Sequence, residues 1–209
     1  MMTAIQRWHW LAVMLVLTGC AGLQPTPQRS ASPPEVHQRH LASLADIQRF
    51  NIEGRIGVQT DGRGFSGATR WQHAEDRDTI GLFSPLGGQV ANIERTRTSV
   101  VLTDGDGKSY TATDAETLTR QTMGWTLPMR GLPDWALGRP SPDAIELAVW
   151  DAEGKLLRLQ QAGWDIRYQA YTQTGGHQLP SKILMVSPKV NLKLLIERWQ
   201  LGGPAATTP

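Results

Sequence analysis

Hydrophobic and polar residues alternate with a period of two along most of this chain. In the clearest example, the residues Phe50, Ile52, Gly54, Ile56 and Val58 alternate with Asn51, Glu53, Arg55, Gly57 and Gln59. Such alternation predicts a strand with one face buried. Similar patterns predict strands at 65–71, 77–84, 89–96, 98–103, 108–112, 155–161, 164–171, 182–186 and 189–196.

Short turn signals separate many of these predicted strands. Asp61-Gly62 is typical of a hairpin turn, and residues 104–107 (DGDG) predict another. Pro85 and the pair Gly87-Gly88 predict a turn with Leu86 at its tip, facing water. Antiparallel strands that follow one another along the chain pair most simply with their neighbours. The pattern therefore predicts one strongly curved sheet or an incomplete barrel.

Three segments have helical patterns instead. Hydrophobic spacing over 34–47 predicts an amphipathic helix. Thr113, followed three residues later by Glu116, predicts a capping box and a short helix that ends at about Met123, before Gly124. A second short helix is predicted over 132–138. The insert at 113–138 is the obvious candidate to fill the concave face of the sheet.

The N-terminus has the features of an export signal. Arg7 precedes an apolar run at 10–17, which is too short to span a bilayer about 30 Å thick. The ending Leu17-Thr18-Gly19-Cys20 resembles the lipobox of bacterial lipoproteins, in which the signal is cut before the Cys and the Cys is acylated. The alternative is an ordinary signal peptide with a chance Cys nearby.

Composition gives the expected organisation of the chain. Cys20 is the only Cys, so no intramolecular disulfide is possible. The predicted parts are a signal peptide (1–19), the acylated Cys20 with a Pro- and Ser-rich tether (20–34), one domain (35–201) and a disordered tail (202–209). Loss of Arg7 with the signal lowers the formal charge from +2 to +1. A chain this close to neutral, with no basic block, argues against nucleic acid as a partner.

Candidate catalytic motifs fail on their spacing. Residues 107–109 (GKS) end like a P-loop, but Leu102 stands where that motif needs Gly. Asp104 and Asp106 begin like a calcium loop, but Ala115 stands at the twelfth position where a Glu is required. The histidines lack the spacing of metal ligands. We therefore expect no catalytic residue, no metal and no cofactor beyond the covalent lipid on Cys20.

Tryptophan is unusually common in the predicted domain. The six indoles there are Trp71, Trp125, Trp135, Trp150, Trp164 and Trp199. Large rigid apolar rings suit ordinary core packing. In a half-open barrel, they suit the wall of an alkyl-binding cavity equally well. The residues alone leave both interpretations open.

An ordered set of motifs resembles one family. The set runs from the lipobox through Trp71-Gln72, residues 84–87 (SPLG), 110–112 (YTA), 114–116 (DAE), Pro128, Leu132, residues 135–138 (WALG), Trp164, Tyr168 and Tyr171 to Trp199. This order resembles the LolB family of outer-membrane lipoprotein receptors over nearly all of the mature chain. The likeness is weak over 139–163, whose structure the sequence leaves open. Ala21, in place of the Asp that often signals inner-membrane retention, favours the outer membrane by the same resemblance.

The resemblance implies a fold and a function. The implied fold is mainly β (α+β), a single-domain half-open antiparallel β-barrel with short helices capping its mouth around an apolar cavity. Members take lipoprotein cargo from the periplasmic carrier LolA and insert it into the inner leaflet of the outer membrane. We expect a lipid-anchored monomer on the periplasmic face, and no enzyme.

Site residues follow from the same resemblance and from strand position. An exposed leucine on a protruding loop moves cargo to the membrane in this family, and Leu86, between Pro85 and Gly87, matches it. The alternative is a turn leucine that folds back onto the sheet. Candidates for the acyl cavity, chosen by strand parity or by position on the capping helices, are Trp71, Leu82, Leu132, Trp135, Leu137, Trp164 and Tyr168.

Two other classes of function compete with lipid transfer. One is a non-catalytic structural lipoprotein that scaffolds an envelope complex around a packed barrel. The other is a hydrolase acting on lipid or glycan. An apolar void of several hundred Å³ would favour transfer over scaffolding. A nucleophile hydrogen-bonded to a base inside that void would favour an enzyme.

Overall fold

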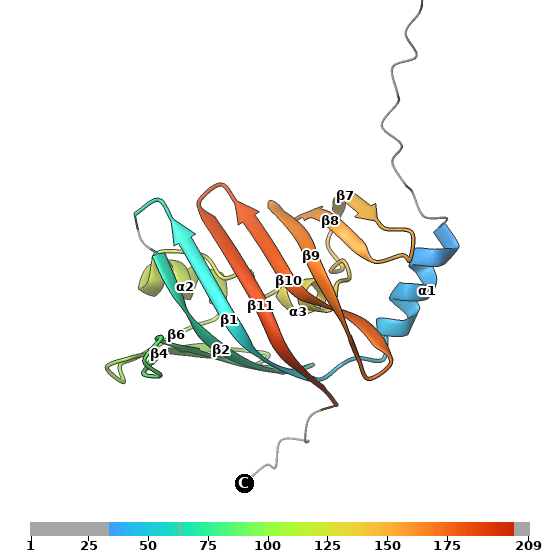
Figure 1. The fold of residues 1–209 in the computed structure, drawn as a ribbon. Coiled ribbons are helices and arrows are strands. Elements are labelled where there is room, and N and C mark those ends of the chain that lie inside the picture. The colour runs from blue at the N-terminus through green and yellow to red at the C-terminus, as the bar shows by residue number, and fades with distance from the viewer. Residues whose placement is uncertain (1–33, 63, 203–209) are drawn as a thin grey trace, which may run out of the picture.

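A computed structural model describes residues 34–62 and 64–202 of the chain (Figure 1). The predicted signal peptide, Cys20, nearly all of the tether and residues 203–209 lie outside the described residues. The elements in chain order are α1 (Pro34–Leu44), β1 (Phe50–Thr60), β2 (Gly64–Ala74), β3 (Arg77–Phe83), β4 (Gln89–Arg95), β5 (Val100–Asp104), β6 (Ser109–Ala112), α2 (Ala115–Met123), α3 (Leu132–Leu137), β7 (Ile145–Trp150), β8 (Leu156–Gln161), β9 (Trp164–Thr174), β10 (His177–Ser187) and β11 (Val190–Leu201).

The strands form one antiparallel sheet that does not close. Its order is β6-β5-β4-β3-β2-β1-β11-β10-β9-β8-β7, so the first and last strands of the chain pair in its middle. The sheet curves around α2 and α3, and α1 lies beside β7 and β8 (Figure 1). The predicted half-open barrel with short helices is confirmed. None of the helices in the described residues has the length and apolar character needed to cross a membrane.

Alternation along β1 decides which face of the sheet is buried. Phe50, Ile52, Ile56 and Val58 are buried, whereas Arg55 between them is exposed. The register with β11 shifts between Glu53 and Gly54, which is a bulge. A Cβ on Gly54 would lie 2.0 Å from the Leu195 carbonyl oxygen, so only glycine fits this central position.

Several element boundaries differ from the sequence predictions. The N-cap of α2 is Asp114, whose carboxylate accepts the Thr117 amide at 2.7 Å, so the capping box from Thr113 to Glu116 was wrong. Gly124 does end that helix, in the left-handed conformation. The first helix ends at Leu44 rather than at residue 47.

The strand β7 was not predicted from the sequence. It lies at an edge of the sheet, and its residues run from exposed to half-buried without alternating. A period of two is visible only where one face of a strand is buried and the other is solvated. The strand β10 begins earlier than predicted, with Pro180 at a register shift where a strand tolerates proline.

The helix α1 packs against the β7–β8 end of the sheet. The His37 ring stacks on Trp150 with centroids 4.8 Å apart. The Arg139 guanidinium donates to the Leu44 carbonyl at 2.6 Å and to the Asp134 carboxylate at 2.7 Å. These contacts join the end of α1 to α3 through one arginine.

We predict that acid weakens the fold partly through His40 on α1. Burial lowers the pKa of His40 below its ordinary value of 6.5; Lys155 and His177 lower it further, and Asp151 opposes them. Because the unfolded chain binds the proton more readily, the free energy of unfolding falls as the pH drops below 6.5. Urea unfolding above and below that pH should show a shallower fall for His40→Gln. An identical fall in both proteins would contradict the prediction.

Candidate functional site

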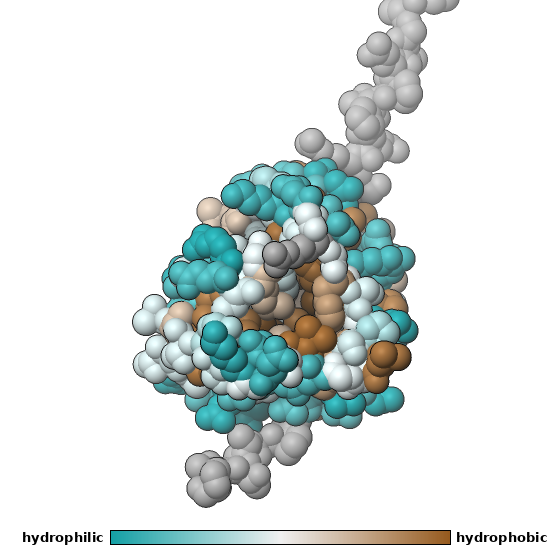
Figure 2. All heavy atoms as spheres, turned by 90° about the vertical axis from the view of Figure 1, so that its left-hand side faces the viewer, coloured by the Kyte–Doolittle hydropathy of each residue, from teal (hydrophilic) through white to brown (hydrophobic). Residues whose placement is uncertain are grey.

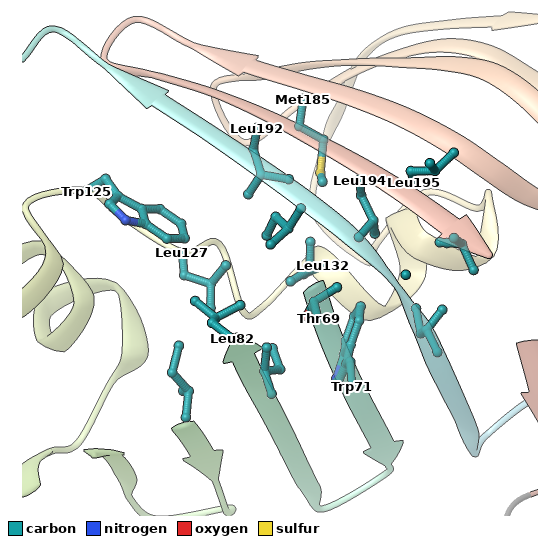
Figure 3. A pocket seen from close by; sticks show the side chains of 16 residues that line it. Thr69, Trp71, Leu82, Trp125, Leu127, Leu132, Met185, Leu192, Leu194 and Leu195 are labelled. Carbon is teal, nitrogen blue, oxygen red and sulfur yellow. The ribbon is translucent and has the colours of Figure 1, made fainter. Parts of the chain in front are cut away.

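An apolar pocket lies on the concave face of the sheet, beneath the segment that joins α2 to α3 (Figure 3). We call residues 124–132 the covering segment. Sixteen residues line the pocket: Ile52, Gly54, Ile56, Thr69, Trp71, Ile80, Leu82, Ile93, Trp125, Leu127, Leu132, Met185, Leu192, Leu194, Leu195 and Ile196. None of them is charged, and the one hydroxyl, of Thr69, donates to the Gly81 carbonyl at 3.2 Å. The pocket therefore offers almost only hydrocarbon to a ligand.

Cross-strand register brings the sheet residues of the pocket together. Trp71 on β2 lies opposite Ile80 on β3, which lies opposite Ile93 on β4. On the other side of β1, Ile56 lies opposite Leu194 on β11. The strands on both sides of β1 thus form one continuous wall of the pocket.

The covering segment supplies the opposite wall. Its Trp125, Leu127 and Leu132 side chains are buried and point toward the sheet (Figure 3). The Leu127 amide donates at 3.0 Å to the hydroxyl of Thr119, a buried residue of α2. This hydrogen bond ties the covering segment to α2. The contacts of the segment with the sheet across the pocket are apolar.

The pocket is nearly filled by its own side chains. Its cavity measures about 30 Å³, within about 520 Å³ of unfilled space that is partly open to solvent. Pockets that hold small ligands usually measure 300–1,000 Å³. The structure therefore lacks, in this arrangement, the apolar void of several hundred Å³ that would by itself favour lipid transfer over scaffolding. Figure 2 nevertheless shows one end of the molecule hollowed, with hydrophobic residues inside the hollow.

Three of the seven predicted cavity residues line this pocket: Trp71, Leu82 and Leu132. Trp135 and Trp164 instead line a more open depression of about 530 Å³, together with Pro128 of the covering segment. Leu137 and Tyr168 line neither space, although both are buried. These four residues therefore do not line the apolar pocket in this arrangement, and their place in an acyl-binding cavity stays a prediction.

Hydrogen bonds and a ring contact explain where three of those residues, Trp135, Trp164 and Tyr168, lie. The Trp135 indole donates to the Gln161 side chain at 2.8 Å, and the Tyr168 hydroxyl donates to the Trp135 carbonyl at 3.0 Å. The rings of Trp135 and Trp164 lie 6.4 Å apart. These contacts fix α3 to β8 and β9, so the residues anchor the helix rather than line the pocket. Burial raises the pKa of Tyr168, which keeps its hydroxyl protonated as a donor.

Sequence reasoning missed most of the pocket wall. Ile52 and Ile56 on β1, with Leu192 and Leu194 on β11, belonged to alternations that the sequence displays, but parity alone does not say which face is concave. The burial of this face beneath the covering segment supplies that information. Trp125 and Leu127 of the covering segment follow no periodic pattern that could have assigned them.

A buried carboxylate holds one wall residue of the pocket in place. Asp78 is fully buried, and its carboxylate accepts the Trp71 indole N–H at 2.8 Å and lies 2.7 Å from His73 Nδ1. The Arg95 guanidinium donates to its second oxygen at 2.6 Å. His73 and Arg95 in turn line a polar pocket of about 540 Å³. Asp78 therefore marks the boundary between the apolar pocket and a charged one.

The loop between β3 and β4 presents a bare leucine to solvent. Leu86 is 98% exposed, more than any other large hydrophobic residue described. The Gly87 amide donates to the Ser84 carbonyl at 2.9 Å, and the Ser84 amide donates to the Gly88 carbonyl at 2.8 Å. Pro85 fits the second position of this turn, and Gly87 has the positive φ of +87° that follows it. The turn predicted from Pro85 and Gly87 is therefore present.

The fold and the pocket define a half-open β-barrel protein with an apolar, covered concave face. The sequence profile of the family described as "Outer membrane lipoprotein LolB" matches residues 48–199. The chain therefore belongs to the LolB family of outer-membrane lipoproteins, whose members act in lipoprotein localisation and are not known as enzymes. The resemblance drawn from the ordered motifs is confirmed.

Individual relatives agree with this assignment. The outer-membrane lipoprotein LolB of Nitrosomonas europaea is 37% identical over 94% of this chain and 93% of its own. That of Nitrosococcus oceani is 35% identical over 94% of this chain and all of its own. A solved structure of a DUF1329 family protein from Desulfovibrio piger is similar in fold, with a TM-score of 0.55, 6% identity, and coverage of 82% of this chain and 92% of that one.

We predict that Asp78→Ala destabilises the protein by about 3 kcal/mol, because it leaves the part-buried Arg95 and the Trp71 N–H without their acceptor. Urea denaturation followed by tryptophan fluorescence measures the change. Glu53→Ala is the matched control, since Glu53 pairs with Arg198 on the exposed face and its loss should cost under about 1 kcal/mol. Equal losses in both variants would contradict the role assigned to Asp78.

Proposed function

We propose that this protein accepts lipoproteins from the periplasmic carrier LolA and inserts them into the inner leaflet of the outer membrane. Its own lipid, on Cys20, would hold it at the periplasmic face. The observation that supports this proposal is the uncharged pocket between the sheet and the covering segment. Acyl chains need such hydrocarbon walls, and no covalent step is required to move them.

Acyl binding in this scheme requires the pocket to open. A cavity of about 30 Å³ has room for about one water molecule, so the covering segment must move away from the sheet before a chain can enter. The contacts across the pocket are apolar and are not directional, so a chain that replaces Trp125, Leu127 and Leu132 restores much of the buried area. Such an exchange keeps the net free energy of binding small.

A small net free energy suits a protein that must release its cargo. Transfer without nucleotide hydrolysis runs from weaker to stronger binding, so affinity must rise from carrier to receptor to bilayer. Each step of about 1.4 kcal/mol shifts the equilibrium tenfold. A permanently open cavity that bound acyl chains as tightly as a membrane does would retain the cargo.

Leu86 would make the contact with the bilayer. Burial of one leucine yields about 1.5–3 kcal/mol, which is too little to anchor a protein. For a chain already tethered by lipid, it is enough to bias which part of the surface meets the membrane. The turn at Ser84–Gly88 projects the side chain away from the sheet, which suits this role.

One observation favours a second candidate function. A cavity of about 30 Å³ is also what a packed, ligandless barrel would have, as expected of a structural lipoprotein that scaffolds an envelope complex. The two candidates differ in whether the pocket ever admits an acyl chain. The experiments below separate them on that point.

We predict that Leu86→Glu separates acceptance from delivery. A carrier–lipoprotein complex is mixed with the chain, and the cargo is followed first onto the chain and then into floated phospholipid vesicles. The variant should accept cargo normally and deliver little, because a charged side chain does not enter hydrocarbon. Leu157→Glu is the matched control, since Leu157 is 45% exposed on β8, and it should deliver normally. Normal delivery by Leu86→Glu would refute the role of the loop, and failure of the unmodified chain to accept cargo would refute transfer.

We predict that an acyl chain enters beneath Trp125. A lysophospholipid with a brominated acyl chain should quench tryptophan fluorescence in the unmodified protein, because Trp71 and Trp125 line the pocket. Trp125→Phe should reduce the quenched fraction. Trp150→Phe, which removes an indole stacked on α1 outside the pocket, should not reduce it. Quenching that is absent, or unaffected by Trp125→Phe, would support the packed scaffold instead.

A further inference from the structure

The outer face of the central strands carries cations without carboxylate partners. They are Arg55 on β1, Arg70 on β2, Lys193 on β11 and Lys182 on β10. Strand parity places all four on the face opposite the apolar pocket. Within the described residues, none of the four forms an ion pair, whereas Arg198 on β11 pairs with Glu53. The outer face therefore has an uncompensated positive charge.

Two of these cations lie beside the loop that bears Leu86. Arg55 and Arg70 line an open groove of about 310 Å³ together with Phe83, Pro85 and Gly87. The Arg70 guanidinium lies 5.0 Å from the centre of the Phe83 ring, and Phe83 is the last residue of β3 before the loop. Both arginines thus lie near the base of the turn whose tip is Leu86, and the Phe83 ring holds the Arg70 guanidinium there.

The groove also contains one carboxylate. Glu197 on β11 lines it and is exposed, and it forms no ion pair within the described residues. Two arginines and one glutamate leave the groove with one net positive charge. An anion that enters the groove is attracted by the arginines and repelled by Glu197. Neutral substitutions of the arginines should therefore weaken anion binding, and a neutral substitution of Glu197 should strengthen it.

We propose that Arg55 and Arg70 bind the phosphate groups of anionic phospholipids when Leu86 enters the acyl layer. A guanidinium stays charged at any relevant pH, and the net negative charge that attracts it is carried by anionic phospholipids but not by phosphatidylcholine, whose choline neutralises its phosphate. An apolar tip with cations at its base matches a membrane surface, where hydrocarbon lies beneath a layer of phosphates. The outer face of β1 and β2 then faces the head groups.

This inference rests on the membrane contact proposed for Leu86, and it adds lipid selectivity to that contact. Hydrocarbon insertion alone does not distinguish an anionic lipid from a zwitterionic one. Each basic residue near an anionic surface strengthens binding about fivefold, so the two arginines together contribute about 25-fold. This part of the binding weakens as salt screens the charges.

The test uses the mature-length chain (residues 20–209) with Cys20→Ser, which cannot be acylated and contains all of the described domain. Its binding is measured by flotation with vesicles of phosphatidylethanolamine and phosphatidylglycerol, and with vesicles of phosphatidylethanolamine and phosphatidylcholine. We expect Arg55→Gln/Arg70→Gln to weaken binding to the phosphatidylglycerol vesicles about 25-fold. We expect little change with phosphatidylcholine. Glu197→Gln should strengthen binding to the anionic vesicles.

The matched control is Arg77→Gln/Arg97→Gln. Both arginines are exposed and unpaired within the described residues; Arg77 is the first residue of β3, next to the β2–β3 turn, and Arg97 lies in the β4–β5 turn. These turns are at the far end of β3, about 20 Å from Phe83 along the strand. The control removes the same charge and should leave binding almost unchanged. Arg55→Lys/Arg70→Lys, which keeps the charge, should retain most of the binding.

Other outcomes would overturn the inference. Equal weakening by both arginine pairs would mean that only net charge matters. Displacement from vesicles by inorganic phosphate, but not by chloride at the same ionic strength, would point to a site for a soluble anion. An unaffected Arg55→Gln/Arg70→Gln variant, with delivery still impaired by Leu86→Glu, would refute the arginine site and leave the proposed function intact. Selective loss of anionic binding in a chain that accepts no cargo would instead refute transfer alone.

Discussion

The pairing of the first strand with the last is the interaction on which the rest of the structure depends. The strands β1–β6 and β7–β11 are two separate runs of antiparallel hairpins, and the ladder between β1 and β11 makes them one sheet. The bulge at Gly54 interrupts this ladder and increases its local twist. Ile52 and Ile56 from one run then meet Leu194 and Ile196 from the other, so the apolar pocket exists only because the two ends of the chain pair.

Directional and non-directional forces are separated in this molecule. Hydrogen bonds fix α3 to β8 and β9 through Trp135, Gln161 and Tyr168, and the Asp78 carboxylate fixes Trp71 within the sheet. Between the sheet and the covering segment, by contrast, the contacts are apolar, with the one hydrogen bond from Leu127 directed back to α2. Hydrogen bonds thus hold each wall of the pocket in place. The contact between the sheet and the covering segment depends only on buried hydrocarbon, and an acyl chain can replace that contact.

The sequence predicted what depends on periodicity and local turn chemistry, and it failed where tertiary pairing decides. Alternation identified β1, and the proline–glycine pattern identified the turn around Leu86, because both signals are local. The N-cap was misplaced by one residue, since Thr113 and Asp114 are both good caps and only the backbone geometry distinguishes them. Four of the seven cavity candidates do not line the pocket, because a buried residue that anchors a helix has the same sequence pattern as one that faces a void.

The incomplete closure of the barrel has a mechanical consequence. A closed barrel can widen only by breaking backbone hydrogen bonds, because each of its strands has two neighbours. Here β6 and β7 each pair on one side, so a small change in curvature spread over eleven strands can enlarge the interior with every ladder intact. Both free edges are short, of four and six residues, which limits their use as templates for another chain. Enlarging the interior therefore requires the sheet to bend, but it does not require any strand to lose its partner.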